Sequence, residues 1–257
     1  MTALARGGAI ILGLAALWQL VYAATGVPSY ILPSPIEVLH AGVSRSPELA
    51  RHALVTLIEI ALGLAFGTAA GLAIAHIMMV WRWTRDWLMP LSIASQAIPV
   101  FALAPILVLW LGYGLASKVA MTALIVFFPV TAAAFDGLRR TPKDALDAAY
   151  AMTRGHPRAA SRVLWRIRWP MALPVLIPGL KTAAAISPIG AVIGEWVGAS
   201  EGLGHAMLKA NSRTEIDMMF ACAAVLMAMG VGLFLLADWG LRRLAPWAAA
   251  KPGDEAE

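Results

Sequence analysis

Five ionisable side chains interrupt long apolar runs of the sequence, at Glu59, His76, Lys181, Glu195 and Asp238. Such groups are costly at membrane depth, so they tend to face the interior of a helix bundle or an aqueous path. Glu195 is the strongest candidate for chemistry because it lies beside Trp196 at the end of a Gly/Pro-rich run. The pair predicts the mouth of a path for a cation or a polar solute. The alternative is an interfacial Glu–Trp pair that only anchors a helix.

Three neutral polar residues, Ser95, Gln96 and Ser187, offer hydrogen bonds within the same apolar runs. They are further candidates for lining a translocation path. The alternative for each is a hydrogen bond between helices, worth about 1 kcal/mol or less.

Residue patterns of the common enzyme classes are absent from the sequence. It has no HExxH, GxSxG, CxxC or GxxxxGK[ST] motif. Its histidines are scattered without metal-ligand spacing, and its single cysteine, Cys222, allows no disulfide within the chain. We therefore expect no catalytic residue, no metal and no cofactor, and any active transport must draw energy from a partner or an ion gradient.

The elements that would position these residues are membrane helices. The chain of 257 residues is 60% hydrophobic and only 14% charged, whereas soluble domains carry about 25% charged residues. Apolar runs long enough to cross a bilayer recur throughout, so we expect an all-α polytopic protein with about six spans. Their ranges are roughly 9–25, 54–80, 87–111, 116–136, 175–198 and 218–240. We expect residues 1–247 to form one transmembrane domain and 248–257 a disordered tail.

Spans three and five carry helix-breaking residues. Span three contains Pro90, Pro99 and Pro105. Span five contains Pro178 and Pro188 together with several glycines. Proline removes a backbone donor and kinks or breaks a helix, and interrupted spans are common around transport paths. We expect both spans to be kinked; the alternative is packing plasticity, because Pro and Gly are frequent in membrane helices.

The positive charges are divided unevenly between the two sets of connecting segments. One set holds 14 of the 20 lysines and arginines, in 1–8, 81–86, 137–174 and 241–257, and the opposite set holds five. Cytoplasmic segments of membrane proteins are enriched in Lys and Arg, so we expect both termini in the cytoplasm. The same distribution explains the net charge of +5 without nucleic-acid binding.

The segment between spans four and five is the longest basic stretch. Arg154, Arg158, Arg162 and Arg166 recur every four residues, a spacing that would align them on one face of a helix. Gly155-His156-Pro157 interrupts the segment, so we expect two short helices with a bend between them. The alternative is a basic amphipathic segment lying on anionic lipid.

Residues around this bend match a longer pattern. Asp147-Ala148-Ala149 gives an acid-Ala-Ala start, Gly155 a central glycine, and Ile167-Arg168-Trp169-Pro170 an end of the form hydrophobic-x-Leu-Pro with Trp for Leu. The pattern resembles the cytoplasmic signature of permease subunits of binding-protein-dependent ABC importers. The spacing departs from the signature, because five residues rather than three precede Gly155, and Gly155 to Pro170 is also two residues longer.

Two other segments extend this resemblance. Residues 31–38 ("ILPSPIEV") and 98–118 ("IPVFALAPILVLWLGYGLASK") resemble the nitrate, sulfonate, taurine and pyrimidine branch of the family. Together the motifs cover nearly the whole chain.

The resemblance implies partners and a mechanism. In that family the basic segment forms a coupling helix that docks into a cytoplasmic ATPase. The coupling residues implied here are Asp147, Ala148, Ala149, Gly155 and Pro170. The resemblance also implies a second permease copy in a homodimer, two ATPase subunits that bind the ATP, and a periplasmic or lipid-anchored solute-binding protein. Transport would cross the bacterial inner membrane by alternating access.

The solute is suggested by a finer resemblance. Residues 183–213 resemble permeases for hydroxymethylpyrimidine, a thiamine precursor. A nitrate or sulfonate would favour cations along the path, and the spans offer few. Trp196 could stack on an aminopyrimidine and Glu195 could accept its hydrogen bonds. An aliphatic sulfonate, taurine or nitrate permease is the alternative of the same class; a membrane-embedded enzyme or a lone ion-coupled carrier is the alternative of another class.

Overall fold

The computed structural model describes the backbone of residues 3–249, and side chains there except those of 3–6, 11, 95, 96, 248 and 249. Every regular element in this part of the chain is helical, which confirms the all-α prediction. The elements are α1 (Ala3–Thr25), α2 (Pro35–Ser44), α3 (Ser46–Val80), α4 (Arg82–Ala97), α5 (Val100–Leu111), α6 (Leu115–Arg139), α7 (Lys143–Met152), α8 (Ala159–Val163), the π-helical turn η1 (Leu164–Arg168), α9 (Trp169–Gly198), α10 (Leu203–Ser212), α11 (Ile216–Leu244) and α12 (Pro246–Ala249). The tail predicted at 248–257 lies almost entirely outside the described residues.

Among the described residues, five helical segments are long and apolar enough to cross a membrane. They are Gly7–Thr25, Ser46–Val80, Leu115–Arg139, Ala159–Gly198 and Ile216–Leu244. The remaining predicted span, at 87–111, is divided between two shorter helices, α4 and α5. They are separated at Ile98, which is extended with ψ 122°, because a residue that precedes proline is disfavoured in the helical region.

Span five follows a different course from span three. Helix α9 continues without interruption through Pro174, Pro178 and Pro188. The irregular backbone lies instead just before it, in η1, where five residues are π-helical. Such turns are rare and are frequent at functional sites.

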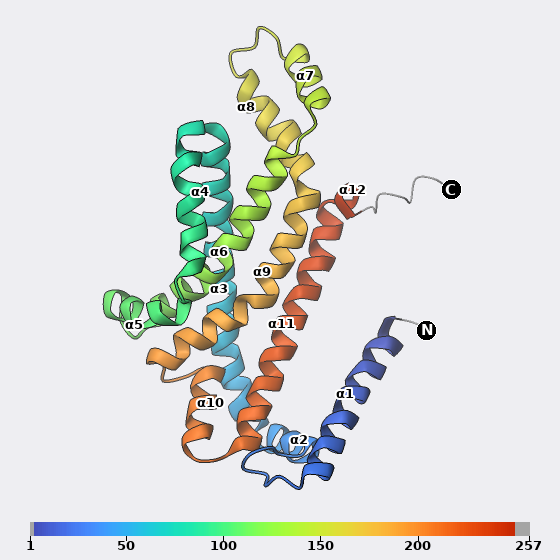
Figure 1. Cartoon of the computed structure of the whole chain (residues 1–257), viewed down its shortest axis with the longest axis vertical. Helices are drawn as coiled ribbons and strands as arrows, with labels where there is room; N and C mark the ends of the chain where they lie inside the picture. Colours follow the sequence, from blue (N-terminus) through green and yellow to red (C-terminus); the bar gives the residue numbers. More distant parts are fainter. Residues whose placement is uncertain (1–2, 250–257) are drawn as a thin grey trace.

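Helix α6 forms the centre of the bundle, packed along α3 on one side and α9 on the other (Figure 1). Small residues permit this close packing. A Cβ added at Gly67 of α3 would lie 2.7 Å from the carbonyl oxygen of Ala123 on α6. A Cβ added at Gly194 of α9 would lie 3.0 Å from the Cα of Lys118 on α6. These glycines therefore bring three backbones into near contact.

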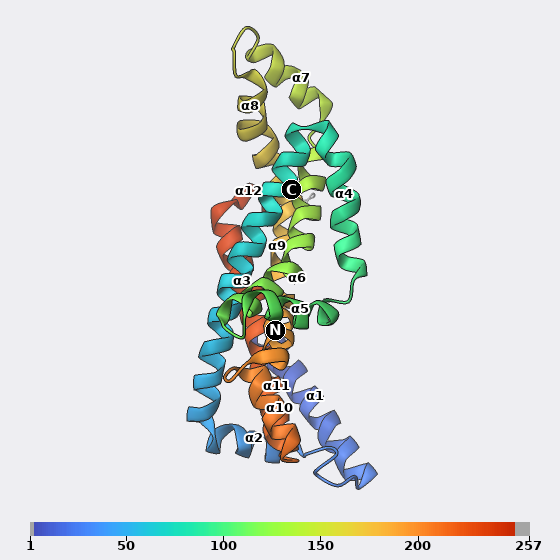
Figure 2. The same ribbon diagram turned by 90° about the vertical axis from the view of Figure 1, so that its left-hand side faces the viewer.

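The two ends of the bundle carry different short helices (Figures 1 and 2). Helices α7 and α8 project from one end, and α2 and α10 lie at the other. Helix α1 leans away from the bundle and is attached to it near α2, where the Trp18 ring lies 5.5 Å from that of Phe220 and Trp18 Nε1 donates to the Pro33 carbonyl at 3.1 Å. The separation of the two ends places the candidate coupling residues far from the polar residues near α10.

Candidate functional site: a projecting hairpin and a buried polar network

The projecting hairpin consists of α7, α8 and the turn between them. The predicted pair of short helices with a bend at Gly155-His156-Pro157 is confirmed. Gly155 has a φ of 84°, in the left-handed region that glycine enters without a steric penalty. No atom outside its chain neighbours would lie within 4 Å of a Cβ added there. The glycine is therefore required by the backbone conformation of the bend, not by crowding.

The hairpin and the first turn of α9 hold the five predicted coupling residues at different depths. Asp147 and Ala148 are exposed on α7, whereas Ala149 is buried. Gly155 is exposed in the turn, and Pro170 is half-buried in the first turn of α9. The structure thus brings Asp147, Ala148 and Ala149 together on α7 and leaves Pro170 at the base of the hairpin.

Two exposed apolar residues on α7 were not selected from the sequence. Tyr150 is 43% exposed and Met152 is 88% exposed. A methionine left in solvent beside Asp147 and Ala148 offers an adaptable apolar contact for a partner. The sequence could have indicated Met152 as a contact residue, because it is an apolar residue near the C-terminal end of the acid-Ala-Ala helix.

The base of the hairpin is fixed to the ends of three long helices. Leu138 of α6, Leu164 of η1 and Ala172 of α9 form a buried cluster, against which Met79 of α3 packs. The Arg168 guanidinium donates to the Leu138 carbonyl oxygen at 3.3 Å. The base of the hairpin is therefore in direct contact with the ends of α3, α6 and α9.

A buried polar network occupies the opposite end, where α3, α9 and α10 meet. The Glu195 side chain is 1% exposed. Its Oε1 accepts from the Thr56 hydroxyl at 2.6 Å, and its Oε2 accepts from the backbone N–H of Gly204. Thr56 Oγ1 accepts in turn from the Leu203 N–H at 2.8 Å. Because Gly204 lies in the first turn of α10, a carboxylate also suits the N-terminal end of that helix dipole.

A second carboxylate lies buried between α3 and α6. Glu59 Oε1 is 3.3 Å from Lys118 Nζ, and their side chains are 1% and 9% exposed. Glu59 Oε2 is buried and, within the described residues, has no hydrogen-bond partner. The sequence shows Glu59 as an ionisable residue in an apolar run and Lys118 in a connecting segment, and it does not predict that the two are paired.

The predicted path residues are not gathered into one site. The Ser187 hydroxyl is buried and donates to the Ala184 carbonyl at 2.8 Å, within its own helix. The side chains of Ser95 and Gln96, near the end of α4, lie outside the described residues. Trp196 is 41% exposed, while its neighbour Glu195 is buried in the network.

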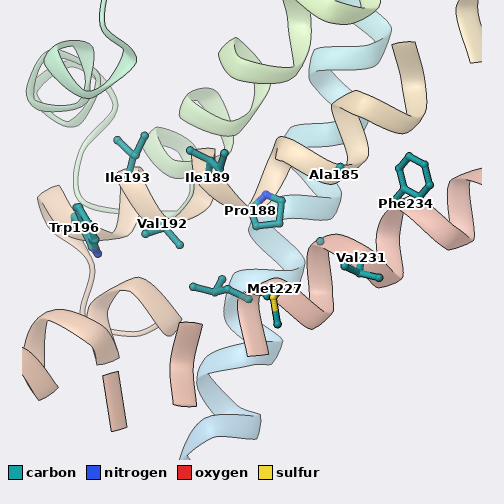
Figure 3. Close-up of a pocket in the computed structure, with 11 residues that line it drawn as sticks. Ala185, Pro188, Ile189, Val192, Ile193, Trp196, Met227, Val231 and Phe234 are labelled. Atoms are coloured by element: carbon teal, nitrogen blue, oxygen red, sulfur yellow. The ribbon is translucent and has the colours of Figure 1, made fainter. Parts of the chain in front are cut away.

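Trp196 lies at one end of a cavity between α9 and α11 (Figure 3). The cavity has a volume of about 600 Å³. Its lining is entirely apolar or aromatic and includes Pro188, Val192, Met227 and Phe234. The side chains that line it carry no charge to attract an ion.

Metal-ligating side chains do not cluster in the described part of the chain, where no group of three or more His, Cys, Asp or Glu is placed to hold an ion. The structure instead combines a projecting hairpin, long helices that pack closely through small residues, and buried polar contacts between those helices.

Comparison with known proteins identifies the class of this arrangement. Residues 63–249 match the family described as "binding-protein-dependent transport system inner membrane component". The chain belongs to this family. The permease is therefore a membrane transport subunit and not an enzyme, and its family implies a solute-binding protein and an ATPase as partners.

Curated relatives cover nearly the full length of the permease. A probable ABC transporter permease protein of Haemophilus influenzae is 46% identical over 88% of this chain and 91% of the relative. The formylaminopyrimidine transport permease protein ThiX of Halalkalibacterium halodurans is 35% identical over 90% of this chain and 91% of its own. The riboflavin transport system permease protein RibX of Chloroflexus aurantiacus is 35% identical over 91% of this chain and 86% of its own. Permeases named for taurine and aliphatic sulfonates also match, at 28% identity or less.

A solved structure shares the fold of the permease. An inward-facing form of the MetNI methionine ABC transporter aligns with a TM-score of 0.66 at 18% identity, covering 80% of this chain and 99% of that chain. This likeness supports the all-α permease architecture and carries no information on the solute.

Proposed function

We propose that the permease imports a small heterocycle that contains a pyrimidine ring, with hydroxymethylpyrimidine or a related thiamine precursor as the favoured solute. The observation that carries this proposal is the pairing of both lysines that lie in the membrane-length helical segments, Lys118 in α6 and Lys181 in α9. Lys118 Nζ lies 3.3 Å from Glu59, and Lys181 Nζ lies 2.7 Å from Asp238. A sulfonate or nitrate path would be favoured by unpaired cations, and these two are already paired.

The relatives support the same class of solute. ThiX is named for formylaminopyrimidine and RibX for riboflavin, and each is 35% identical to this chain. Both molecules contain a flat ring that an exposed indole such as that of Trp196 can stack upon. In this conformation both carboxylate oxygens of Glu195 accept hydrogen bonds, from Thr56 and from Gly204. A solute could bond to Glu195 only after these hydrogen bonds break. A taurine or aliphatic sulfonate permease is the second candidate.

The hairpin supports a proposed assembly. Two copies of the permease would form a homodimer, and α7 of each would dock into an ATPase subunit through Asp147, Ala148 and exposed Met152. ATP binding would draw the ATPases together, and the fixed base at Leu138 would pass this motion to α3, α6 and α9. The path would open outward to receive the solute from its binding protein and return inward after hydrolysis.

We propose an orientation with the hairpin in the cytoplasm of a bacterium and with α2 and α10 on the outer face of its inner membrane. The end of α11 lies on the hairpin side of the bundle (Figure 1), which supports a cytoplasmic C-terminus. Cys222 is buried, so cysteines introduced at the exposed Arg154 and at Glu201 can be compared directly. A membrane-impermeant maleimide applied to whole cells should label Glu201→Cys and spare Arg154→Cys; the reverse pattern would overturn the orientation.

Uptake by the reconstituted complex tests the solute. Labelled hydroxymethylpyrimidine, riboflavin and taurine would be offered to proteoliposomes that contain the permease, its ATPase and its binding protein. We expect ATP-dependent uptake of the pyrimidine, reduced about tenfold by Trp196→Ala and little changed by Trp110→Ala, which alters a 75% exposed indole of α5. Uptake of taurine alone would favour the second candidate, and ATP-independent uptake by this chain alone would indicate an ion-coupled carrier.

A further inference from the structure

Two cavities of opposite character meet at the base of the hairpin. One is an apolar slot of about 470 Å³, lined by Leu72, Ala73, His76, Ile77, Trp165 and Trp169. The other is a cationic pocket of about 530 Å³, whose lining includes Arg158, Arg162 and Arg166. Trp165 lines both cavities, so the slot and the pocket are neighbours that share this side chain.

The apolar slot has a stiff aromatic wall. The rings of Trp165 and Trp169 stack with centroids 5.9 Å apart. The ring of His76 lies 5.0 Å from that of Trp165, and Trp169 Nε1 donates to His76 Nδ1 at 3.3 Å. Because these contacts hold one another in place, the slot does not need to be formed by the ligand. Trp165 nevertheless remains 58% exposed.

The cationic pocket holds charges without counterions. Arg158, Arg162 and Arg166 are exposed, and none forms an ion pair with any described acidic residue. No acidic side chain lines the pocket. The four-residue spacing seen in the sequence thus resolves into three arginines at one pocket, with Arg154 left outside it in the turn.

The positions of the two cavities along the membrane normal indicate what kind of ligand would fill both. The slot lies along the last turns of α3, inside a helix long enough to span the membrane. The pocket lies beyond it, on the hairpin. A ligand that fills both must have an apolar chain at membrane depth and an anionic head at the interface, where basic pockets beside membrane helices bind acidic head groups.

We propose that this composite site binds one anionic phospholipid, with an acyl chain against Trp165 and Trp169 and the phosphate on Arg162 and Arg166. The bound lipid would brace η1 and the base of the hairpin against α3. The site is independent of which solute the permease carries.

Lipid nanodiscs test this site on the full chain. The permease would be placed in phosphatidylcholine alone or with phosphatidylglycerol, and its unfolding midpoint and co-purified lipid would be measured. We expect phosphatidylglycerol to stabilise the native chain and to be retained by it. Each of Arg162→Gln and Arg166→Gln should weaken this retention about fivefold, in line with about 1 kcal/mol per basic residue near a membrane surface.

Matched variants distinguish lipid binding at this site from a general effect of the hairpin's charge and from an effect on folding. Arg154→Gln removes the same charge from the hairpin outside both cavities and should keep native retention. Trp165→Ala should lose the retention, whereas Trp87→Ala, at a 69% exposed indole outside the slot, should not. The arginine variants and Trp87→Ala should match the native chain in phosphatidylcholine alone, because the altered side chains are exposed. Trp165→Ala also loses its ring contacts with His76 and Trp169, so its lipid retention is compared at equal amounts of folded protein.

Four outcomes would overturn the site. Equal retention of phosphatidylglycerol by Arg162→Gln/Arg166→Gln and by Arg154→Gln would show that the pocket has no special role. Unchanged retention by Trp165→Ala, or full competition by soluble glycerol phosphate, would show that no acyl chain occupies the slot. Loss of ATPase binding by Arg162→Gln/Arg166→Gln, with lipid retention intact, would assign the arginines to the protein partner.

Discussion

Lys118 Nζ lies 3.3 Å from Glu59 Oε1, and the two side chains are buried between α6 and α3. Removing two charges from water is costly, and their attraction offsets this cost only while both are present. Their helices are also held together by glycine contacts such as that of Gly67 with Ala123. The ion pair and the close packing therefore support each other at the centre of the bundle.

Replacing one member of this pair should destabilise the permease far more than replacing both. Lys118→Met leaves Glu59 buried without its counterion and should destabilise the permease by about 3–5 kcal/mol. The double variant Glu59→Gln/Lys118→Met should recover most of that loss. The free energy of unfolding in one detergent, for both single variants and the double variant, measures the coupling.

Lys181→Met provides the comparison. Its partner Asp238 retains Arg242, whose Nε lies 2.8 Å away, and the pair is partly exposed. A much smaller loss of stability than that of Lys118→Met is expected there, because solvent screens an exposed ion pair. A double variant at Glu59 and Lys118 that is no more stable than Lys118→Met would contradict the paired assignment.

The junction of α9 and α10 should not accept a side chain at position 202. Gly202 has a φ of 113°, and a Cβ added to it would overlap the Glu195 carboxylate. Gly202→Ala should therefore cost about 2 kcal/mol or more through backbone strain and a displaced carboxylate. Thermal unfolding and proteolysis of the 199–202 loop measure the effect.

Gly232→Ala is the control for this substitution. Gly232 lies within α11, and a Cβ there would meet nothing within 4 Å. Alanine is favoured over glycine inside a helix, so this variant should be as stable as the native chain or slightly more so. Equal stability of Gly202→Ala and Gly232→Ala would rule out a structural role for the Glu195 network.

Local features of the fold could be predicted from the sequence because they depend on neighbouring residues. The bend at Gly155 and the break before Pro99 both follow from the backbone preferences of Gly and Pro. Pairing between distant helices could not be predicted in this way. The contact of Glu59 with Lys118 depends on how α3 and α6 cross, which the apolar pattern of either helix leaves open.

The candidate site shows a similar limit. In the sequence, Glu195 and Trp196 form one candidate unit because they are adjacent. Consecutive residues on an α-helix point about 100° apart, and here Trp196 faces the α9–α11 cavity while Glu195 faces Thr56. The Gly-Leu-Gly segment at 202–204 carried a usable signal, because backbone N–H groups at the start of a helix favour a nearby carboxylate.

Low pH should weaken the ion pair between Arg45 and Glu215, at the end of the bundle that carries α2 and α10. The hydrogen bond from the Arg45 guanidinium holds the pKa of Glu215 below its usual value. A carboxylate with a lowered folded pKa stabilises the protein above its unfolded pKa, about 4.3, and this stability is lost as the pH falls through the lower folded value. Glu215→Gln should thus lower the unfolding midpoint by about 2 °C near pH 7.

The pH profile provides the check on this pair. Native and Glu215→Gln permeases should have converging unfolding midpoints once the pH falls below about 4. A constant difference between them over the whole acid range would mean that Glu215 contributes through its shape rather than its charge.

The bend at Gly155 should control transmission from the ATPase rather than insertion of the spans. Gly155→Val forces a β-branched residue into a φ of 84°, a conformation that such residues avoid, and should tilt α7 away from α8. We expect normal membrane levels, weakened ATPase co-purification and uptake reduced at least tenfold. Gly155→Asn tests the cause, because asparagine tolerates the left-handed region and should retain most uptake. If Gly155→Val co-purifies with the ATPase and transports at the native rate, the hairpin is not the coupling element.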